Sequence, residues 1–133
     1  MVLFGMALTI PQHESKLCKQ LDWPAWAAVT VSNDLVSWEK ERDRAKRSNE
    51  PLVMSSVSFL MRQRSLTEAE AKKICRSKIQ EYVTKYLQNV ESAKRDPHVS
   101  SELRTYLEAV TYSISGNLVW SFYSPRYQPE VSA

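Results

Sequence analysis

The stretch Asn33-Asp34-Leu35-Val36-Ser37-Trp38-Glu39-Lys40-Glu41 places three oxygen-bearing side chains, Asn33, Ser37 and Glu41, at successive four-residue steps. Each residue of an α-helix turns about 100°, so these steps bring the three groups to one side of a helix. An amide carbonyl, a hydroxyl and a carboxylate are hard oxygen donors, which Mg²⁺ prefers. The stretch therefore fits a helix with a magnesium site, but from these three residues alone an ordinary solvated helix face is the more frequent explanation.

The composition favours a single helical domain. The chain has 133 residues, of which 43% are hydrophobic and 25% charged, and its only glycines are Gly5 and Gly116. This length suffices for a substantial core, and the scarcity of glycine disfavours a turn-rich β architecture. A net charge of +3 is too small to indicate nucleic acid or an anionic membrane as a partner. Cys18 and Cys75 lack the spacing of a zinc site or a disulfide framework, so we expect a cytoplasmic location.

Periodicity and stop signals predict an all-α architecture of about five helices packed as a partial bundle. The apolar residues 1–9, too short to span a membrane, are interpreted as the end of a buried helix that Pro11 stops. The helix with the metal motif is expected to begin at Asp22, whose side chain would cap it, with Pro24 in its first turn. Residues 48–51 would end this helix, and residues 52–62 would form a short apolar helix.

Two longer helices are expected to complete the bundle. The capping-box sequence Thr67-Glu68-Ala69-Glu70 predicts a helix to about Lys94, and Ser100 or Ser101 would cap a last helix that runs to about Trp120. Apolar residues at helical spacing predict the inner faces of both: Cys75, Ile79, Tyr82, Tyr86 and Val90, then Leu103, Leu107, Val110, Ile114 and Leu118. Charged residues lie away from most of the first stripe: Lys72, Lys78, Glu81 and Lys85.

One stripe of the metal helix passes from apolar to polar, through Trp26 and Thr30 to Asn33, Ser37 and Glu41. This gradient fits a helix that lines a cavity with a wet mouth and has Trp26 at the dry end. It also fits a core helix whose end emerges into water. The charged residues 39–47 carry both signs, which indicates a solvated face with i,i+4 pairs rather than a nucleic-acid site.

A second motif lies near the C-terminus, where Arg126 and Tyr127 follow Trp120 by six and seven residues. Together with the Asn-Asp-x-x-Ser-x-x-Lys-Glu helix, this motif resembles the C-terminal half of class I terpene synthases, in particular fungal di- and sesterterpene synthases of the fusicoccadiene and ophiobolin synthase type. The resemblance spans nearly the whole chain. Residues 1–127 are therefore identified as the C-terminal portion of a terpene cyclase domain, and residues 128–133 are expected to form a disordered tail.

The resemblance implies Mg²⁺-dependent ionisation and cyclisation of an allylic prenyl diphosphate, with C20 or C25 substrates, geranylgeranyl or geranylfarnesyl diphosphate, expected. It implies that Asn33, Ser37 and Glu41 hold Mg²⁺ and that Lys40, Arg126 and Tyr127 bind the diphosphate. Trp120 would line the cavity, although a tryptophan that merely packs fits equally well. Without the metal motif, Arg126 and Tyr127 would instead be interpreted as a surface arginine beside a packed tyrosine.

The chain departs from the family it resembles in the second, aspartate-rich metal motif and in the arginine that senses the diphosphate, neither of which is found. Its four aspartates are isolated from one another: Asp22, Asp34, Asp43 and Asp96. We therefore expect a truncated chain that is weakly active or inactive alone. Two alternatives stay open: a half-enzyme that self-associates or needs a partner chain with the aspartate-rich helix, and a non-enzymatic helical interaction protein with a chance polar face.

Overall fold

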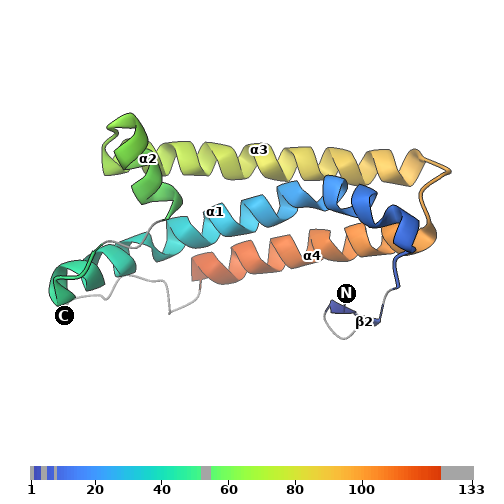
Figure 1. Ribbon diagram of the computed structural model, residues 1–133, viewed down its shortest axis with the longest axis horizontal. Helices are drawn as coiled ribbons and strands as arrows, with labels where there is room; N and C mark the ends of the chain where they lie inside the picture. Colours follow the sequence, from blue (N-terminus) through green and yellow to red (C-terminus); the bar gives the residue numbers. More distant parts are fainter. Residues whose placement is uncertain (1, 4–5, 8, 52–54, 124–133) are drawn as a thin grey trace.

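The fold is a layer of long helices with one helix at its centre. The computed structural model describes residues 2–3, 6–7, 9–51 and 55–123, with side chains for residues 9–51 and 55–117. In chain order the elements are β1 (Val2–Leu3), β2 (Met6–Ala7), the 3₁₀ turn η1 (Gln12–Glu14), α1 (Ser15–Ser48), α2 (Ser56–Arg64), α3 (Glu68–Arg95) and α4 (Ser101–Tyr123). Helix α1 lies between α3 and α4 (Figure 1), which confirms the predicted all-α class.

The predicted helix at the N-terminus is wrong. Strands β1 and β2 pair antiparallel, with Val2 opposite Ala7 and Leu3 opposite Met6. A short apolar run has no periodicity that separates a strand from a buried helix, and here the chain forms strands. The described residues thus form four α-helices rather than about five.

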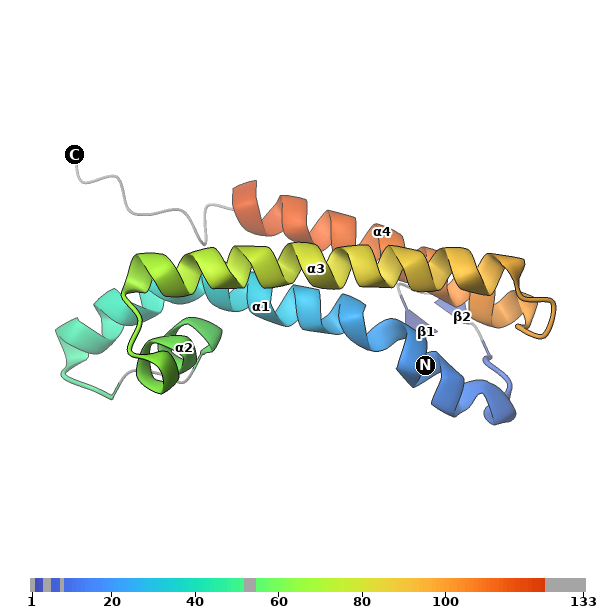
Figure 2. The same ribbon diagram turned by 90° about the horizontal axis from the view of Figure 1, so that it is seen from above.

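Helix α1 begins earlier than predicted, at Ser15 instead of Asp22, so Pro24 lies inside the helix. Proline in a helix interior removes one backbone hydrogen bond and costs about 3 kcal/mol. The extra turns persist because Leu17, Cys18 and Leu21 pack into the core, and tertiary packing outweighs local propensity. Figure 2 shows the N-terminal part of α1 turned away from the direction of the rest of the helix, as expected for a proline kink.

The remaining helix boundaries follow local signals. Asn49, in the left-handed conformation with φ 52°, ends α1. Helix α2 begins at Ser56 rather than at residue 52, because Ser55 and Ser58 form a capping box there. The predicted capping box of Thr67 and Glu70 opens α3, and the hydroxyl of Ser100 accepts the Leu103 N–H of α4 at 3.1 Å.

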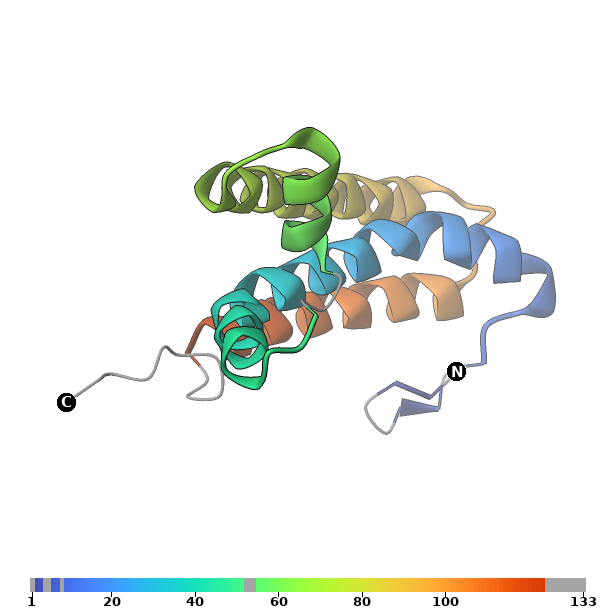
Figure 3. The same cartoon turned by 60° about the vertical axis from the view of Figure 1, so that its left-hand side comes forward.

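Two apolar clusters hold the helices together. The larger lies among α1, α3 and α4, and the smaller joins α1, α2 and α3 at the end of the layer where α2 packs (Figure 3). The predicted inner faces are buried at Cys75, Tyr86, Val90, Leu103, Leu107, Val110 and Ile114, with Ile79 and Tyr82 half-buried, while the side chain of Leu118 lies outside the described residues. Within the described part of the chain, no helix has the length and apolarity needed to cross a membrane.

Candidate metal and diphosphate site

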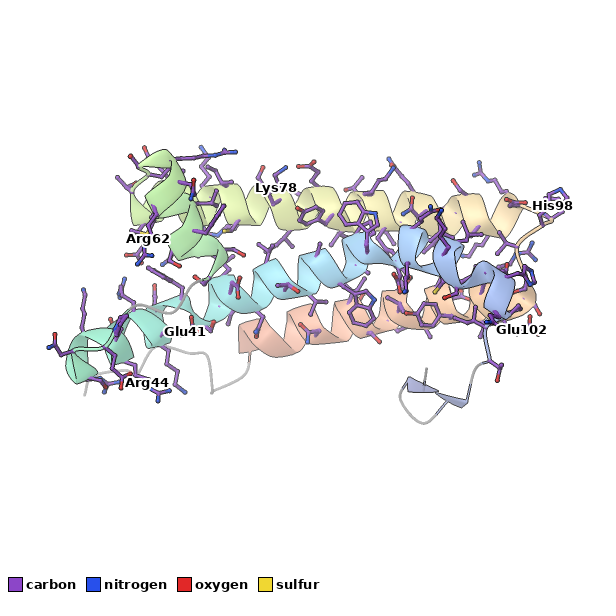
Figure 4. All side chains as sticks on the ribbon, in the orientation of Figure 1. Glu41, Arg44, Arg62, Lys78, His98 and Glu102 are labelled. Atoms are coloured by element: carbon purple, nitrogen blue, oxygen red, sulfur yellow. The ribbon has the colours of Figure 1, made fainter. Side chains whose placement is uncertain are left out.

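The predicted metal ligands all lie on α1, which runs without interruption through the motif. Asn33 is exposed, Ser37 is 9% exposed and Glu41 is half-buried. The Ser37 hydroxyl donates to the backbone carbonyl of Asp34 at 3.5 Å, the long limit of a hydrogen bond. This bond uses the hydroxyl proton and does not occupy the lone pairs of the Ser37 oxygen. No described residue forms an ion pair with Glu41, which lies near the C-terminal end of α1 (Figure 4).

This donor set suits a hard cation. One amide oxygen, one hydroxyl and one carboxylate give a single negative charge, and Mg²⁺ usually completes such a site with waters and phosphate oxygens. In the described part of the chain, no three His, Cys, Asp or Glu side chains gather into a metal cluster. A candidate site among these residues therefore depends on the mixed set Asn33, Ser37 and Glu41, and their role as ligands stays a prediction.

Lys40 is exposed and lies on the same side of α1 as Asn33, because seven residues make almost two full helical turns. The contact of Lys40 with a diphosphate stays a prediction. The other predicted diphosphate residues, Arg126 and Tyr127, lie outside the described residues. The backbone of Trp120 continues α4, but its side chain also lies outside the described residues.

Asp34 performs a structural function that the sequence did not indicate. It lies about 100° around the helix from Asn33. One of its carboxylate oxygens accepts the Ser56 backbone N–H at 2.9 Å and the Ser56 hydroxyl at 2.6 Å. Asp34 thus fastens the first residue of α2 to α1 beside the metal motif. The contact joins residues 22 positions apart, so no local pattern could have revealed it.

An ion-pair network fixes the C-terminal half of α1 against α3. Glu68 accepts from Arg42 at 2.6 Å and from Lys72 at 3.1 Å, and Lys72 also pairs with Glu39 at 3.1 Å. These ion pairs leave the side chain of Lys72 only 17% exposed. Burial raises the pKa of Glu68, but the hydrogen bonds it receives, including those from Lys72 and Arg42, outweigh this effect and leave the pKa lowered.

The upstream part of the stripe also differs from expectation. Trp26, predicted at a dry end, is 38% exposed. Its indole Nε1 donates to the Asp22 carboxylate at 3.2 Å, and the Tyr106 hydroxyl donates to the same oxygen at 2.7 Å. Asp22 is therefore no helix cap but a buried acceptor in α1. The i,i+4 spacing of Asp22 and Trp26 is a local signal that could have predicted their pairing, whereas Tyr106 gave none.

Comparison with known proteins shows similarity over nearly the whole chain. The family described as terpene synthase family 2, C-terminal metal binding, has a sequence model that matches residues 1–85, which include the whole metal motif. Fusicoccadiene synthase of Phomopsis amygdali is 47% identical over 132 residues, covering 99% of this chain and 18% of that protein. The bifunctional type I diterpene synthase of Aspergillus flavipes is 40% identical over 129 residues, covering 97% and 17%.

A bifunctional sesterterpene synthase of Aspergillus aculeatus is 39% identical over 132 residues, covering 99% of this chain and 19% of that protein. The chain thus spans less than a fifth of the length of these relatives. The similarity covers both the metal motif of α1 and the helices that pack around it.

Proposed function

Because the chain belongs to the terpene synthase family 2, whose C-terminal part is described as metal binding, we propose that it binds Mg²⁺ and a prenyl diphosphate as the C-terminal portion of a terpene cyclase. The parent reaction is ionisation of an allylic diphosphate followed by cyclisation. The relatives named diterpene and sesterterpene synthases favour substrates of the length of geranylgeranyl or geranylfarnesyl diphosphate. The observation that carries the proposal is the uninterrupted helix that displays Asn33, Ser37 and Glu41 on successive turns.

In this proposal Asn33, Ser37 and Glu41 hold the cation by their side-chain oxygens. When bound, Mg²⁺ supplies positive charge that stabilises the negative charge growing on the departing diphosphate. Lys40 adds a second positive charge on the same side of α1. Arg126 and Tyr127 are proposed to bind the diphosphate oxygens through the guanidinium fork and the phenol hydroxyl. Trp120 is proposed to line the cavity.

We propose that this chain binds the ion and the diphosphate but turns over little substrate alone. A diphosphate leaves fastest when cations surround it, and the four aspartates of the sequence lie too far apart to form a second metal motif. A cytoplasmic location belongs to the same proposal, since Cys18 and Cys75 are both free thiols.

Calorimetric titration with inorganic pyrophosphate in the presence of Mg²⁺ tests the site directly. We expect binding to weaken at least tenfold in Asn33→Ala and Glu41→Ala. Glu102→Ala is the matched control, because Glu102 is an exposed glutamate of α4 at the opposite end of the molecule from Glu41 (Figure 4). Equal binding by all variants, or no binding by the folded chain, would refute the proposed site.

Product analysis then tests the activity. The purified chain is incubated with Mg²⁺ and farnesyl, geranylgeranyl or geranylfarnesyl diphosphate, and hydrocarbons are identified by gas chromatography and mass spectrometry. We expect traces of product at most. Turnover at the rate of a complete cyclase, persisting in Asn33→Ala, would show that the chemistry uses other residues.

A further inference from the structure

We propose that Asp22 is a positioning residue that fixes the indole of Trp26 on the side of α1 that displays the metal ligands, so that the ring receives a cationic hydrocarbon. This inference rests on the proposed function. It adds a residue that binds neither the metal nor the diphosphate. Asp22 acts through Trp26, and Tyr106 of α4 holds Asp22 in place.

The position of Trp26 follows from the helix geometry. Seven residues separate Trp26 from Asn33, and seven residues make almost two turns, so both side chains leave the same side of α1 about 10 Å apart along the axis. The Thr30 hydroxyl, on the turn between them, donates to the Trp26 carbonyl at 2.9 Å. In the proposed orientation, a ligand whose diphosphate end lies at Asn33 extends its hydrocarbon end along the helix toward Trp26.

The anchoring of Asp22 is built into the core. Asp22 is 7% exposed, and Tyr106, whose hydroxyl donates to it, is 1% exposed and packs in the larger apolar cluster among α1, α3 and α4. A buried carboxylate keeps its charge only when donors satisfy it. Tyr106 and Trp26 are two such donors, from two different helices. Because Tyr106 of α4 holds the carboxylate of Asp22, the hydrogen bond from Trp26 to that carboxylate fixes the indole relative to α4.

The chemistry of the indole matches a positively charged hydrocarbon. Trp26 is 38% exposed, so part of its ring is open to a ligand. A tryptophan ring attracts cations through its electron-rich face, and quaternary ammonium ions are recognised in this way. The negative charge that Asp22 places at Nε1 adds electron density to that ring. A neutral acceptor in the same position would hold the ring by a weaker hydrogen bond and would add no electron density to it.

Trp23 supplies a matched comparison on the same helix. It is 50% exposed and forms a T-shaped contact with Tyr82, with ring centroids 5.8 Å apart and an interplanar angle of 75°. No carboxylate hydrogen bond to its indole is present among the described contacts. Trp23 and Trp26 therefore differ in anchoring and not in exposure alone.

Proton–nitrogen correlation spectra of the indole N–H groups test the anchoring without any ligand. The Trp26 signal is assigned with Trp26→Phe, and its exchange with water is compared among the wild type, Asp22→Asn and Tyr106→Phe. We expect exchange of the Trp26 indole proton to accelerate at least tenfold in Asp22→Asn and less in Tyr106→Phe, while the Trp23 signal stays unchanged. Unchanged exchange in both variants would overturn the proposed anchor; Tyr106→Phe keeps the test valid if Asp22→Asn fails to fold.

Binding of a trimethylammonium ion that carries a geranyl chain tests the ligand. We expect its affinity to fall about three- to tenfold in Trp26→Phe and Asp22→Asn and to stay unchanged in Trp23→Phe. Equal affinity in Asp22→Asn and wild type would overturn the positioning role. The titration contains no metal or diphosphate, so a failure of the magnesium site in the pyrophosphate experiment is distinguishable from a failure of this inference.

Discussion

Glu14 should stabilise the fold in a pH-dependent way, because its buried carboxylate joins the beginning of α1 to the beginning of α4. Glu14 is 3% exposed and accepts both the Ser100 backbone N–H, at 3.0 Å, and the Ser100 hydroxyl. The same hydroxyl oxygen accepts the Leu103 N–H at 3.1 Å. Glu14 thus completes the cap of a helix that is 86 residues away along the chain.

The magnitude follows from the two hydrogen bonds that reach a charged acceptor. Such bonds contribute about 1.5–3 kcal/mol each, less the cost of burying the carboxylate. In Glu14→Gln one carbonyl oxygen remains to accept from Ser100, so we expect the free energy of unfolding to fall by about 1–2 kcal/mol at pH 7. For a chain of this size the melting temperature should fall by roughly 4–7 °C.

The pH dependence has a definite sign. The hydrogen bonds from the Ser100 side chain and backbone lower the pKa of Glu14 from its ordinary value of 4.5. A lowered pKa in the folded state stabilises the protein above the pKa of the unfolded state, and this contribution is lost as the pH falls through the folded pKa. The difference between wild type and Glu14→Gln should therefore be full at pH 7 and shrink below about pH 4.5.

Urea unfolding followed by circular dichroism at several pH values measures this difference. Glu91→Gln is the control, because Glu91 is exposed and contacts Lys94 at 3.6 Å on the surface of α3. We expect the control to change stability by less than about 0.5 kcal/mol. A difference for Glu14→Gln that does not vary between pH 7 and pH 3.5 would refute the role of the carboxylate charge.

Three further predictions concern single side chains outside the proposed ligand set. Asp34→Ala should lower the free energy of unfolding by about 1–2 kcal/mol and speed hydrogen exchange in α2, because Ser56 loses its acceptor; unchanged exchange would contradict this. Ser65 has φ 50°, so Ser65→Gly should raise the thermal midpoint, with a stabilisation of about 0.5–1 kcal/mol. Burial raises the pKa of Cys18 to about 11 and also that of Cys75, so both thiols should resist a thiol reagent at pH 8 until urea unfolds the chain.

Local patterns were sufficient to predict most of the helices. The capping box at Thr67 and the apolar spacing from Leu103 to Ile114 depend on residues within one or two turns, and both predictions are confirmed. The start of α1 depended instead on Leu17, Cys18 and Leu21 packing against distant helices, which outweighs the penalty at Pro24. Periodicity describes one helix at a time, so it cannot show whether packing against other helices outweighs the penalty of a proline inside the helix.

In the candidate site, too, some features could be predicted from local spacing and others could not. The spacing of Asn33, Ser37 and Glu41 depends only on helix geometry, and the structure places all three on one continuous helix. The supports of that helix depend on long-range partners: Asp34 contacts Ser56, and Asp22 contacts Tyr106. A sequence shows which side chains share a helix face. It does not show which residues of other helices contact that face, and these become known only from the structure.

The continuity of α1 restricts how this chain can vary during evolution. Substitutions between Trp26 and Asn33 alter single contacts, but inserting one residue there would rotate Trp26 by about 100° relative to the metal ligands and move it 1.5 Å along the axis. Asp22 and Tyr106 would then hold a ring that faces a different direction. We therefore expect residues 26–41 to tolerate replacement of side chains far better than any change of length.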